Sequence, residues 1–276
     1  MQYAHPRGPF TQHQAGIAVM AKAPVPGRCK TRLVPSLTPD QAASMSAAFL
    51  GDVLANLASA ARTSPITAYV AYAPAGAAAS FAGIVPPATN LLLADGSIEV
   101  PDGVSGFGRC LLHAVQAMLE LGHQSACVLN SDSPNLPTRL LRAAQAALAA
   151  EGDRVVLGPA EDGGYYLLGV KQAHAHLFAH IDWSSEKVAA QTRQRATELG
   201  LSVVELDTWY DVDEPANFYR LLTELASPAS PDAFAAPRTA GNAHRLGLFA
   251  RLPASNAPGP PHYAMGTALT GATECP

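Results

Sequence analysis

Short apolar runs recur along the chain and alternate with longer segments of helical periodicity. The runs predict buried strands at 17–21, 66–73, 90–94, 126–130, 155–157, 165–170 and 201–206. The helical segments lie between most of them, at 39–61, 107–121, 138–150 and 185–199. Strands that alternate with helices of this length predict βαβ units in a mainly parallel sheet, and hence an α/β fold.

Two of the predicted helices have recognisable starts. Thr38-Pro39-Asp40 offers a capping hydroxyl, then a proline at the first helical position and an acid in the first turn. Ser184-Ser185-Glu186 offers a cap followed by an acid, and predicts that the helix of 185–199 begins there.

The same pattern divides the chain into three parts. Residues 1–14 contain no apolar run and are expected to be a flexible segment, and 15–225 to be one folded domain. Residues 226–276 are rich in Pro and Ala with little periodicity, a composition that buries too little apolar surface to offset the cost of ordering. We therefore expect a disordered or loosely attached tail, whose removal after about Leu225 leaves the melting temperature unchanged.

Composition narrows the range of partners. The 276 residues carry a net charge of −4, which gives no electrostatic footprint for nucleic acid or a membrane surface. The first 14 residues have no apolar stretch of the kind a secretory signal needs, and no run approaches the ~20 apolar residues that span a bilayer. We expect a cytoplasmic protein with neither a nucleic-acid nor a membrane partner.

Positive charge is concentrated in one loop directly after the first strand. Residues 22–32 contain Lys22, Arg28, Lys30 and Arg32, and no acidic residue precedes Asp40. A strand followed by a Pro/Gly-rich basic loop and a helix is an arrangement that holds phosphates. The loop lacks the Walker spacing, so its cations are expected to grip a di- or triphosphate directly. A solvated basic loop is the alternative.

An acidic residue follows the strand at 126–130. Asp132 lies in the turn Asn130-Ser131-Asp132-Ser133-Pro134, where open α/β sheets bind ligands. Mg²⁺ or Mn²⁺ takes one or two carboxylates and completes its shell with phosphate oxygens and water. We favour a catalytic, metal-binding Asp132 over a carboxylate that only caps the turn before residue 138.

A second acidic turn opens the strand at 165–170. Asp162 precedes Gly163, Gly164 and Tyr165, and could orient an acceptor or meet the metal while the glycines allow a close approach of a ligand. The alternative is a tight hairpin with Asp-Gly as its turn. Trp183, beside two serines that a helix cap would explain, is a further possible substrate contact.

The last acidic motif follows the strand at 201–206. Asp211 and Asp213 are two residues apart, so in extended chain they share a face. They can supply a further metal ligand, and one of them is expected to cap the next helix near Pro215.

Together, AVMAKAPVPGRCKTRL, NSDSPNLP, GPAEDGGYYLLG, the WSS segment and YDVDEP, in this order, resemble the bacterial GT-A-like glycosyltransferases associated with arsenosugar biosynthesis. That family belongs to the nucleotide-diphospho-sugar transferase superfamily. The resemblance covers about 16–225 and implies a Rossmann-like three-layer α/β/α sandwich. It places the basic loop on the nucleotide phosphates, Asp132 on the metal, 162–164 on the acceptor side, and Asp211 and Asp213 on the late acidic motif.

The reaction type stays open at this point. Asp132 is a lone acid in its turn, without the D-x-D of many glycosyltransferases, and Lys30-Thr31-Arg32-Leu33 also resembles the loop of guanylyltransferases. The leading hypothesis is a metal-dependent transferase that uses a nucleotide sugar and a small-molecule acceptor. The alternatives are a nucleotidyltransferase that releases pyrophosphate and a non-catalytic nucleotide-binding protein.

Overall fold

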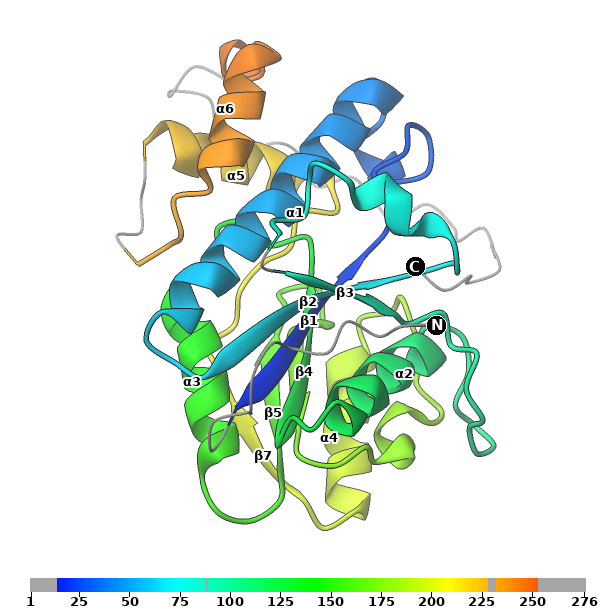
Figure 1. The fold of residues 1–276 in the computed structure, drawn as a ribbon. Coiled ribbons are helices and arrows are strands. Elements are labelled where there is room, and N and C mark those ends of the chain that lie inside the picture. Colours follow the sequence, from blue (N-terminus) through cyan, green and yellow to red (C-terminus); the bar gives the residue numbers. More distant parts are fainter. Residues whose placement is uncertain (1–13, 88, 228–231, 253–276) are drawn as a thin grey trace.

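The computed structural model describes residues 14–87, 89–227 and 232–252 (Figure 1). Except for Gln14, the N-terminal segment expected to be flexible lies outside these residues, as does the last part of the predicted tail.

A seven-stranded sheet forms the centre of the fold, in the order β3-β2-β1-β4-β6-β5-β7. The strands are β1 (Ala15–Ala21), β2 (Ile66–Tyr72), β3 (Asn90–Leu93), β4 (Ser125–Asn130), β5 (Arg154–Pro159), β6 (Tyr165–Val170) and β7 (Ser202–Glu205). All neighbours pair in parallel except β6, which runs antiparallel to both β4 and β5. Each strand coincides with a predicted apolar run to within about three residues at either end.

Helices cover both faces of this sheet, which confirms the predicted α/β/α sandwich (Figure 1). The apolar sides of α1 (Pro39–Ala61) and α3 (Thr138–Ala149) pack on one face. The other face is covered by α2 (Phe107–Glu120), the 3-10 helix Ala175–Phe178 and α4 (Val188–Glu198). Two further 3-10 helices, Thr31–Leu33 and Ala77–Phe81, lie in the loops that follow β1 and β2.

The two predicted helix starts fare differently. Thr38 forms a complete capping box with Gln41 at the start of α1, as its sequence indicates. The start predicted at Ser184-Ser185 is wrong, because α4 begins at Val188. Ser185 Oγ accepts a hydrogen bond from the Lys187 amide and donates one to the Asp182 carbonyl, so it closes the turn before the helix.

The predicted disordered tail is wrong for the part of it that the structure describes. After α5 (Pro215–Ala226), the chain forms α6 (Pro237–Arg245) and the 3-10 helix Phe249–Arg251, and α6 lies against α1 (Figure 1). Within α6, Thr239 and Ala243 are fully buried, which sequence composition does not reveal. Ala243 and Leu248 are buried with α1 and α5 residues in a third apolar cluster.

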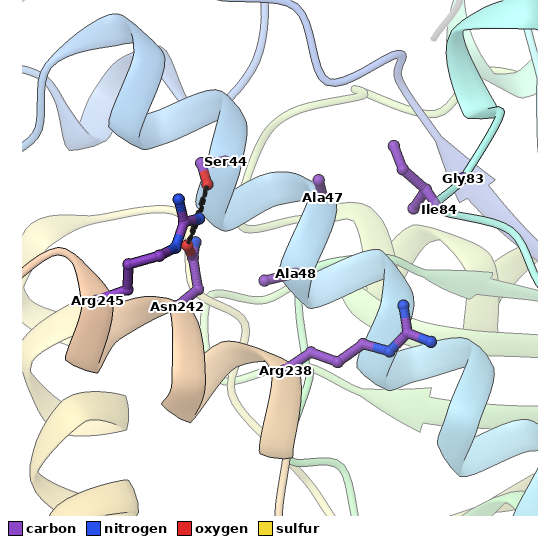
Figure 2. A pocket seen from close by; sticks show the side chains of 8 residues that line it. All are labelled: Ser44, Ala47, Ala48, Gly83, Ile84, Arg238, Asn242 and Arg245. Carbon is purple, nitrogen blue, oxygen red and sulfur yellow. Dashed lines mark hydrogen bonds between the residues drawn. The ribbon is translucent and has the colours of Figure 1, made fainter.

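A buried carboxylate on α1 fixes the start of α6. Asp52 accepts hydrogen bonds from the amides of Arg238 (3.0 Å) and Thr239 (2.7 Å), and so caps a helix that follows it by some 190 residues in sequence. Near the other end, the Arg245 guanidinium donates to Ser44 across the contact (Figure 2). A shallow groove of about 280 Å³ runs between α1, α6 and the turn at Gly83 (Figure 2).

Candidate functional site

The acidic turns and the basic loop come together because of the strand directions. Parallel pairing of β1 with β4 places their carboxyl ends, Met20 opposite Asn130, at one edge of the sheet. The antiparallel β6 starts at that edge, so the turn between β5 and β6 joins them. The segment after β7 is tied in by a hydrogen bond from the Val212 amide to the Asp132 carbonyl (2.9 Å). All four predicted motifs therefore lie at one edge.

Lys30 is at the centre of the site. Its Nζ lies 2.6 Å from Asp132 Oδ1, 2.8 Å from Asp213 Oδ1 and 2.9 Å from the Val212 carbonyl oxygen. These contacts use all three ammonium donors, and the side chain is only 6% exposed. The Lys30 backbone is left-handed (φ 48°), and the ammonium lies 5.8 Å from the Phe49 ring centre.

Although no acidic residue precedes Asp40 in the sequence, two of the four cations of the loop are paired in the structure. Lys30 is paired as described, and Arg32 lies 3.5 Å from Glu214 with both side chains exposed. These acids lie far from the loop in sequence, which is why the local sequence gives no sign of them. Lys22 and Arg28 are exposed, and within the described residues no hydrogen bond or ion pair engages the side chain of either one.

The carboxylates around Lys30 have unlike environments. Burial raises the pKa of Asp132. Burial also acts on Asp213, but the charge and hydrogen bond of Lys30, helped by Arg32, outweigh it and lower the Asp213 pKa. Burial, together with the charges of Asp162, Asp213 and Asp132, raises the pKa of Asp211 to about 7. Lys30 itself keeps its charge, because Asp132 and Asp213 raise its pKa against the effect of burial.

Asp211 should therefore destabilise the metal-free protein at high pH. Its carboxyl loses its proton near pH 3.8 in the unfolded chain and near 7 in the folded one, so stability falls as pH rises through that window. We expect Asp211→Asn to raise the melting temperature in EDTA, by an amount that grows between pH 4 and 7 and then levels off. Asp207→Asn, which removes an exposed carboxylate, is the control. A gain independent of pH would contradict the raised pKa.

The arrangement does not match a ready metal site. Across residues 14–87, 89–227 and 232–252, no three His, Cys, Asp or Glu side chains surround a point where a metal could sit. An ammonium lies between Asp132 and Asp213, two of the three predicted ligands. The carboxylates expected to bind a metal are thus close together, but two of them, Asp132 and Asp213, form ion pairs with Lys30.

The capping alternatives for these acids are wrong. The helix α3 has Pro137 at its N-cap and α5 has Glu214, and neither has a side-chain cap. The Asp132 carboxylate instead contacts Lys30 and accepts a hydrogen bond from Ser131 Oγ. The backbone carbonyl oxygen of Asp211 accepts a hydrogen bond from the side-chain Nδ2 of Asn217, in α5. The Asp211 carboxylate does not cap the helix.

Asp162 lies in the hairpin turn between β5 and β6, as the alternative of an Asp-Gly turn predicts. It also lies close enough to Asp211 for its charge to act on that carboxylate. Asp162 Oδ1 accepts a hydrogen bond from the Gly164 amide (2.8 Å). The two glycines have separate uses. Gly163 has a φ of 89°, and a Cβ there would lie 2.1 Å from the Glu186 carbonyl oxygen. Gly163 therefore admits neighbouring backbone, whereas the sequence suggested that it admits substrate.

Tyr165 and Trp183 lie on the α2 side of the site. Trp183 packs edge-on against Phe107, with the ring centres 5.8 Å apart, and its indole fills the space beside Gly108. The Tyr165 hydroxyl and the Trp183 indole nitrogen are both buried and have no hydrogen-bond partner among the described residues. Both are therefore polar groups that a bound molecule could satisfy.

Sequence reasoning missed the network that holds these acids in place. Asn135 Nδ2 donates to Tyr210 Oη (2.7 Å) and to Glu224 (2.8 Å), and Tyr210 Oη donates to Glu224 (2.6 Å). Ser133 Oγ donates to the Tyr210 carbonyl. The turn after β4 is thereby fixed to the segment after β7 and to α5. Asn135 stands inside a motif that the sequence singled out, so a polar residue in that turn was the available signal.

Comparison with known proteins agrees with this architecture. Among the described helices, none has the length and apolar character needed to cross a membrane. A search of curated proteins finds no relative. Residues 56–185 match a family described as an uncharacterized protein conserved in bacteria (DUF2064).

Solved structures give a clearer likeness. A candidate nucleotide-diphospho-sugar transferase from Desulfovibrio desulfuricans G20 superposes with a TM-score of 0.70 at 24% identity, covering 87% of this chain and 99% of its own. CMP:2-keto-3-deoxy-manno-octonic acid synthetase complexed with CTP reaches 0.46 at 12% identity over 77% and 98%. Rv0371C of Mycobacterium tuberculosis H37Rv, complexed with manganese, reaches 0.36 at 15% over 78% and 99%. The chain thus shares the fold of the Desulfovibrio protein along nearly all of that protein's length.

Proposed function

We propose that this chain is a transferase of the GT-A type that uses a nucleotide-activated sugar and a small-molecule acceptor. One observation carries the proposal: a basic loop and the carboxylates Asp132, Asp211 and Asp213 meet around Lys30 at the carboxyl edge of the sheet. Ligands of open α/β sheets bind at this edge. The fold shared with a candidate nucleotide-diphospho-sugar transferase is consistent with it.

The proposed roles follow from charge. Lys22 and Arg28 are exposed cations without a protein partner in the described structure, and with Arg32 they would bind the diphosphate and take up negative charge as it leaves. Asp132 and Asp162 are the proposed catalytic carboxylates. Gly164, Tyr165 and Trp183 are proposed on the acceptor side, where the two unpartnered donors lie. Gly163 contributes there through the packing of Glu186.

A divalent cation, Mg²⁺ or Mn²⁺, belongs to the proposal as a cofactor. Its proposed ligands are Asp132, Asp211 and Asp213, because hard cations prefer carboxylate oxygens. In the described arrangement Lys30 holds two of these three groups, so the present geometry does not support direct metal binding. A cytoplasmic location is likewise a proposal.

A nucleotidyltransferase is the second candidate, and the lone acid of the turn after β4 favours it. In that reaction an acceptor phosphate attacks the α-phosphorus of a nucleoside triphosphate and pyrophosphate leaves. In glycosyl transfer the acceptor attacks the anomeric carbon and a nucleoside diphosphate leaves. Both reactions need cations at the same phosphates, so the basic loop serves either.

The products distinguish these reactions. The full chain is incubated with Mg²⁺ or Mn²⁺, a panel of nucleotide sugars, a panel of nucleoside triphosphates and a range of small hydroxyl- and phosphate-bearing acceptors. We expect acceptor-dependent release of nucleoside diphosphate, measured by a coupled assay. Pyrophosphate release from a triphosphate would favour the second candidate. Nucleotide binding without turnover of any donor would indicate a non-catalytic nucleotide-binding protein.

A further inference from the structure

Arg220, an exposed residue of α5, contacts two carboxylates and an aromatic ring at once. Its Nη1 donates to Glu161 Oε2 at 2.7 Å, and its Nε donates to Glu224 Oε1 at 3.1 Å. The guanidinium carbon lies 3.8 Å from the centre of the Tyr210 ring. A guanidinium is planar, so it can stack on a ring while its edge binds carboxylates. We call these four side chains the Arg220 clamp.

Two partners of Arg220 directly precede carboxylates of the candidate site. Glu161 precedes Asp162 in the β5–β6 turn, and Tyr210 precedes Asp211 in the segment after β7. The backbone joins the same two segments, because the Glu161 amide donates to the Trp209 carbonyl at 3.0 Å. The clamp therefore adds a side-chain connection beside a single backbone hydrogen bond.

The third partner extends the clamp to the turn after β4. Glu224 Oε2 accepts hydrogen bonds from Asn135 Nδ2 (2.8 Å) and from Tyr210 Oη (2.6 Å), while its other oxygen accepts from Arg220. Asn135 lies three residues after Asp132. Three segments that are distant in sequence, each with an acid of the site, thus meet at one guanidinium and one carboxylate.

The position of the clamp suits ordering of the site more than stabilisation of the fold. The side chains of Arg220 and Glu161 are 42% and 47% exposed, and an ion pair this exposed adds little to stability. Among the described residues, however, it is the one side-chain hydrogen bond that joins the turn 160–164 to another segment. The orientation of this turn therefore depends on Arg220.

We propose that Arg220 is a positioning residue that fixes the β5–β6 turn, and with it Asp162, against the two segments that carry the other acids. The inference rests on the proposed function, in which Asp132 and Asp162 are the catalytic carboxylates. Arg220 needs no contact with a substrate, because it acts through Glu161 and Glu224. A misplacement of about 1 Å in a reaction centre can lower the rate by up to about 10²-fold.

The test by turnover is Arg220→Met, which removes the guanidinium and keeps an unbranched side chain. With the donors and acceptors of the product assay, we expect kcat to fall about tenfold and KM for the donor to stay within about twofold. The donor is spared because the cations proposed to bind its phosphates, Lys22 and Arg28, belong to the loop after β1. An unchanged kcat, or a loss that appears only in KM, would overturn the proposal.

Variants of Glu161 separate positioning from a direct effect of its charge. Glu161→Gln keeps an oxygen that can accept the bond from Arg220, and Glu161→Ala removes it. Positioning predicts that Glu161→Ala lowers kcat as much as Arg220→Met does, that Glu161→Gln keeps most of the activity, and that the double variant Arg220→Met/Glu161→Ala loses no more than either single one. Equal losses for the two Glu161 variants, or additive losses in the double variant, would contradict positioning.

Arg193→Met is the matched control. Arg193 binds Glu205 through Nε at 2.6 Å and through Nη2 at 3.1 Å, and the two side chains are 37% and 45% exposed. The pair joins α4 to β7, and among the described residues neither side chain bonds to the three segments of the clamp. We expect its kcat to stay within about twofold of the wild type. A tenfold loss here would show a general effect of losing an exposed arginine and contradict the proposal.

Amide exchange followed by NMR tests the position of the turn without turnover. The Glu161 amide bonds to the Trp209 carbonyl, and the Gly164 amide bonds to Asp162 Oδ1 at 2.8 Å. We expect Arg220→Met to accelerate exchange of both amides at least about fivefold, Arg193→Met to leave them unchanged, and the melting temperature of Arg220→Met to fall by no more than about 4 °C.

The exchange measurement also separates the two proposals. Unchanged exchange at Glu161 and Gly164 in Arg220→Met would overturn the positioning role, whatever the reaction. Faster exchange throughout the sheet would identify Arg220 as a general stabilising residue and contradict it as well. A chain that turns over no donor would contradict the proposed function, and the exchange at these two amides would still decide whether Arg220 fixes the turn.

Discussion

Asp132→Asn is expected to reduce acceptor-dependent turnover by about 10²- to 10³-fold, the usual cost of removing one charge-stabilising group from a reaction centre. Asp132 follows β4 directly, contacts Lys30 and is held by the Ser133 and Asn135 hydrogen bonds of its own turn. The amide keeps a hydrogen-bond acceptor for Lys30 but loses the charge. Turnover is measured at saturating donor, with the melting temperature recorded to show that the variant is folded.

Asp207→Asn is the matched control for this change. It removes the carboxylate of Asp207, which follows β7. This side chain is 68% exposed and, among the described residues, forms an ion pair only with Arg139. We expect its turnover to equal that of the wild type. If Asp132→Asn keeps full turnover with an unchanged KM for the donor, Asp132 is not a catalytic carboxylate.

Truncation after Ser227 is expected to lower the melting temperature strongly, which reverses the expectation drawn from composition. It removes α6 and with it Ala243 and Leu248, which are 0% and 1% exposed in the third apolar cluster. It also leaves the buried carboxylate of Asp52 without the two amides that bind it. Together these losses amount to at least about 3 kcal/mol, or about 6–12 °C for a domain of this size.

Two controls separate the causes. Truncation after Leu252 keeps α6, so comparison with the shorter chain isolates residues 228–252. Leu248→Ala, in the full-length chain, should lose about 2–5 kcal/mol through the cavity it leaves. Thermal unfolding followed by circular dichroism measures all three. A truncation after Ser227 that melts with the wild type would show that α6 contributes nothing to stability.

The strands and most helices could be predicted because their signals are local. An apolar run such as 165–170 or a capping residue such as Thr38 can be recognised from neighbouring residues alone, without knowledge of the tertiary structure. The partners of Lys30 are not of this kind. Asp213 is 183 positions away, and only the order and direction of the strands bring the two together. The residues of the candidate site could therefore be proposed from the sequence, but the ion pairs between them could not.

The misjudged tail has a related cause. The helix α6 is nine residues long and none of them is a large apolar residue, so its composition gives little sign that it packs against anything. It is ordered by its packing against α1 and by the cap from Asp52, which also belongs to α1. Composition measures what a segment can bury by itself, and it has no information about what a distant helix provides.

The antiparallel strand β6 has a consequence for how the protein is made. Because β6 lies between β4 and β5, a nascent chain that has emerged only through β5 holds a four-stranded parallel half whose β4 edge is still unpaired. In the folded sheet that edge is paired by β6, which is complete only once synthesis, at the ribosome's ~5–20 residues per second, has passed residue 170. Asp132 stands on the first half and Asp162 on the second, so the reaction centre is assembled at the seam where the two halves join.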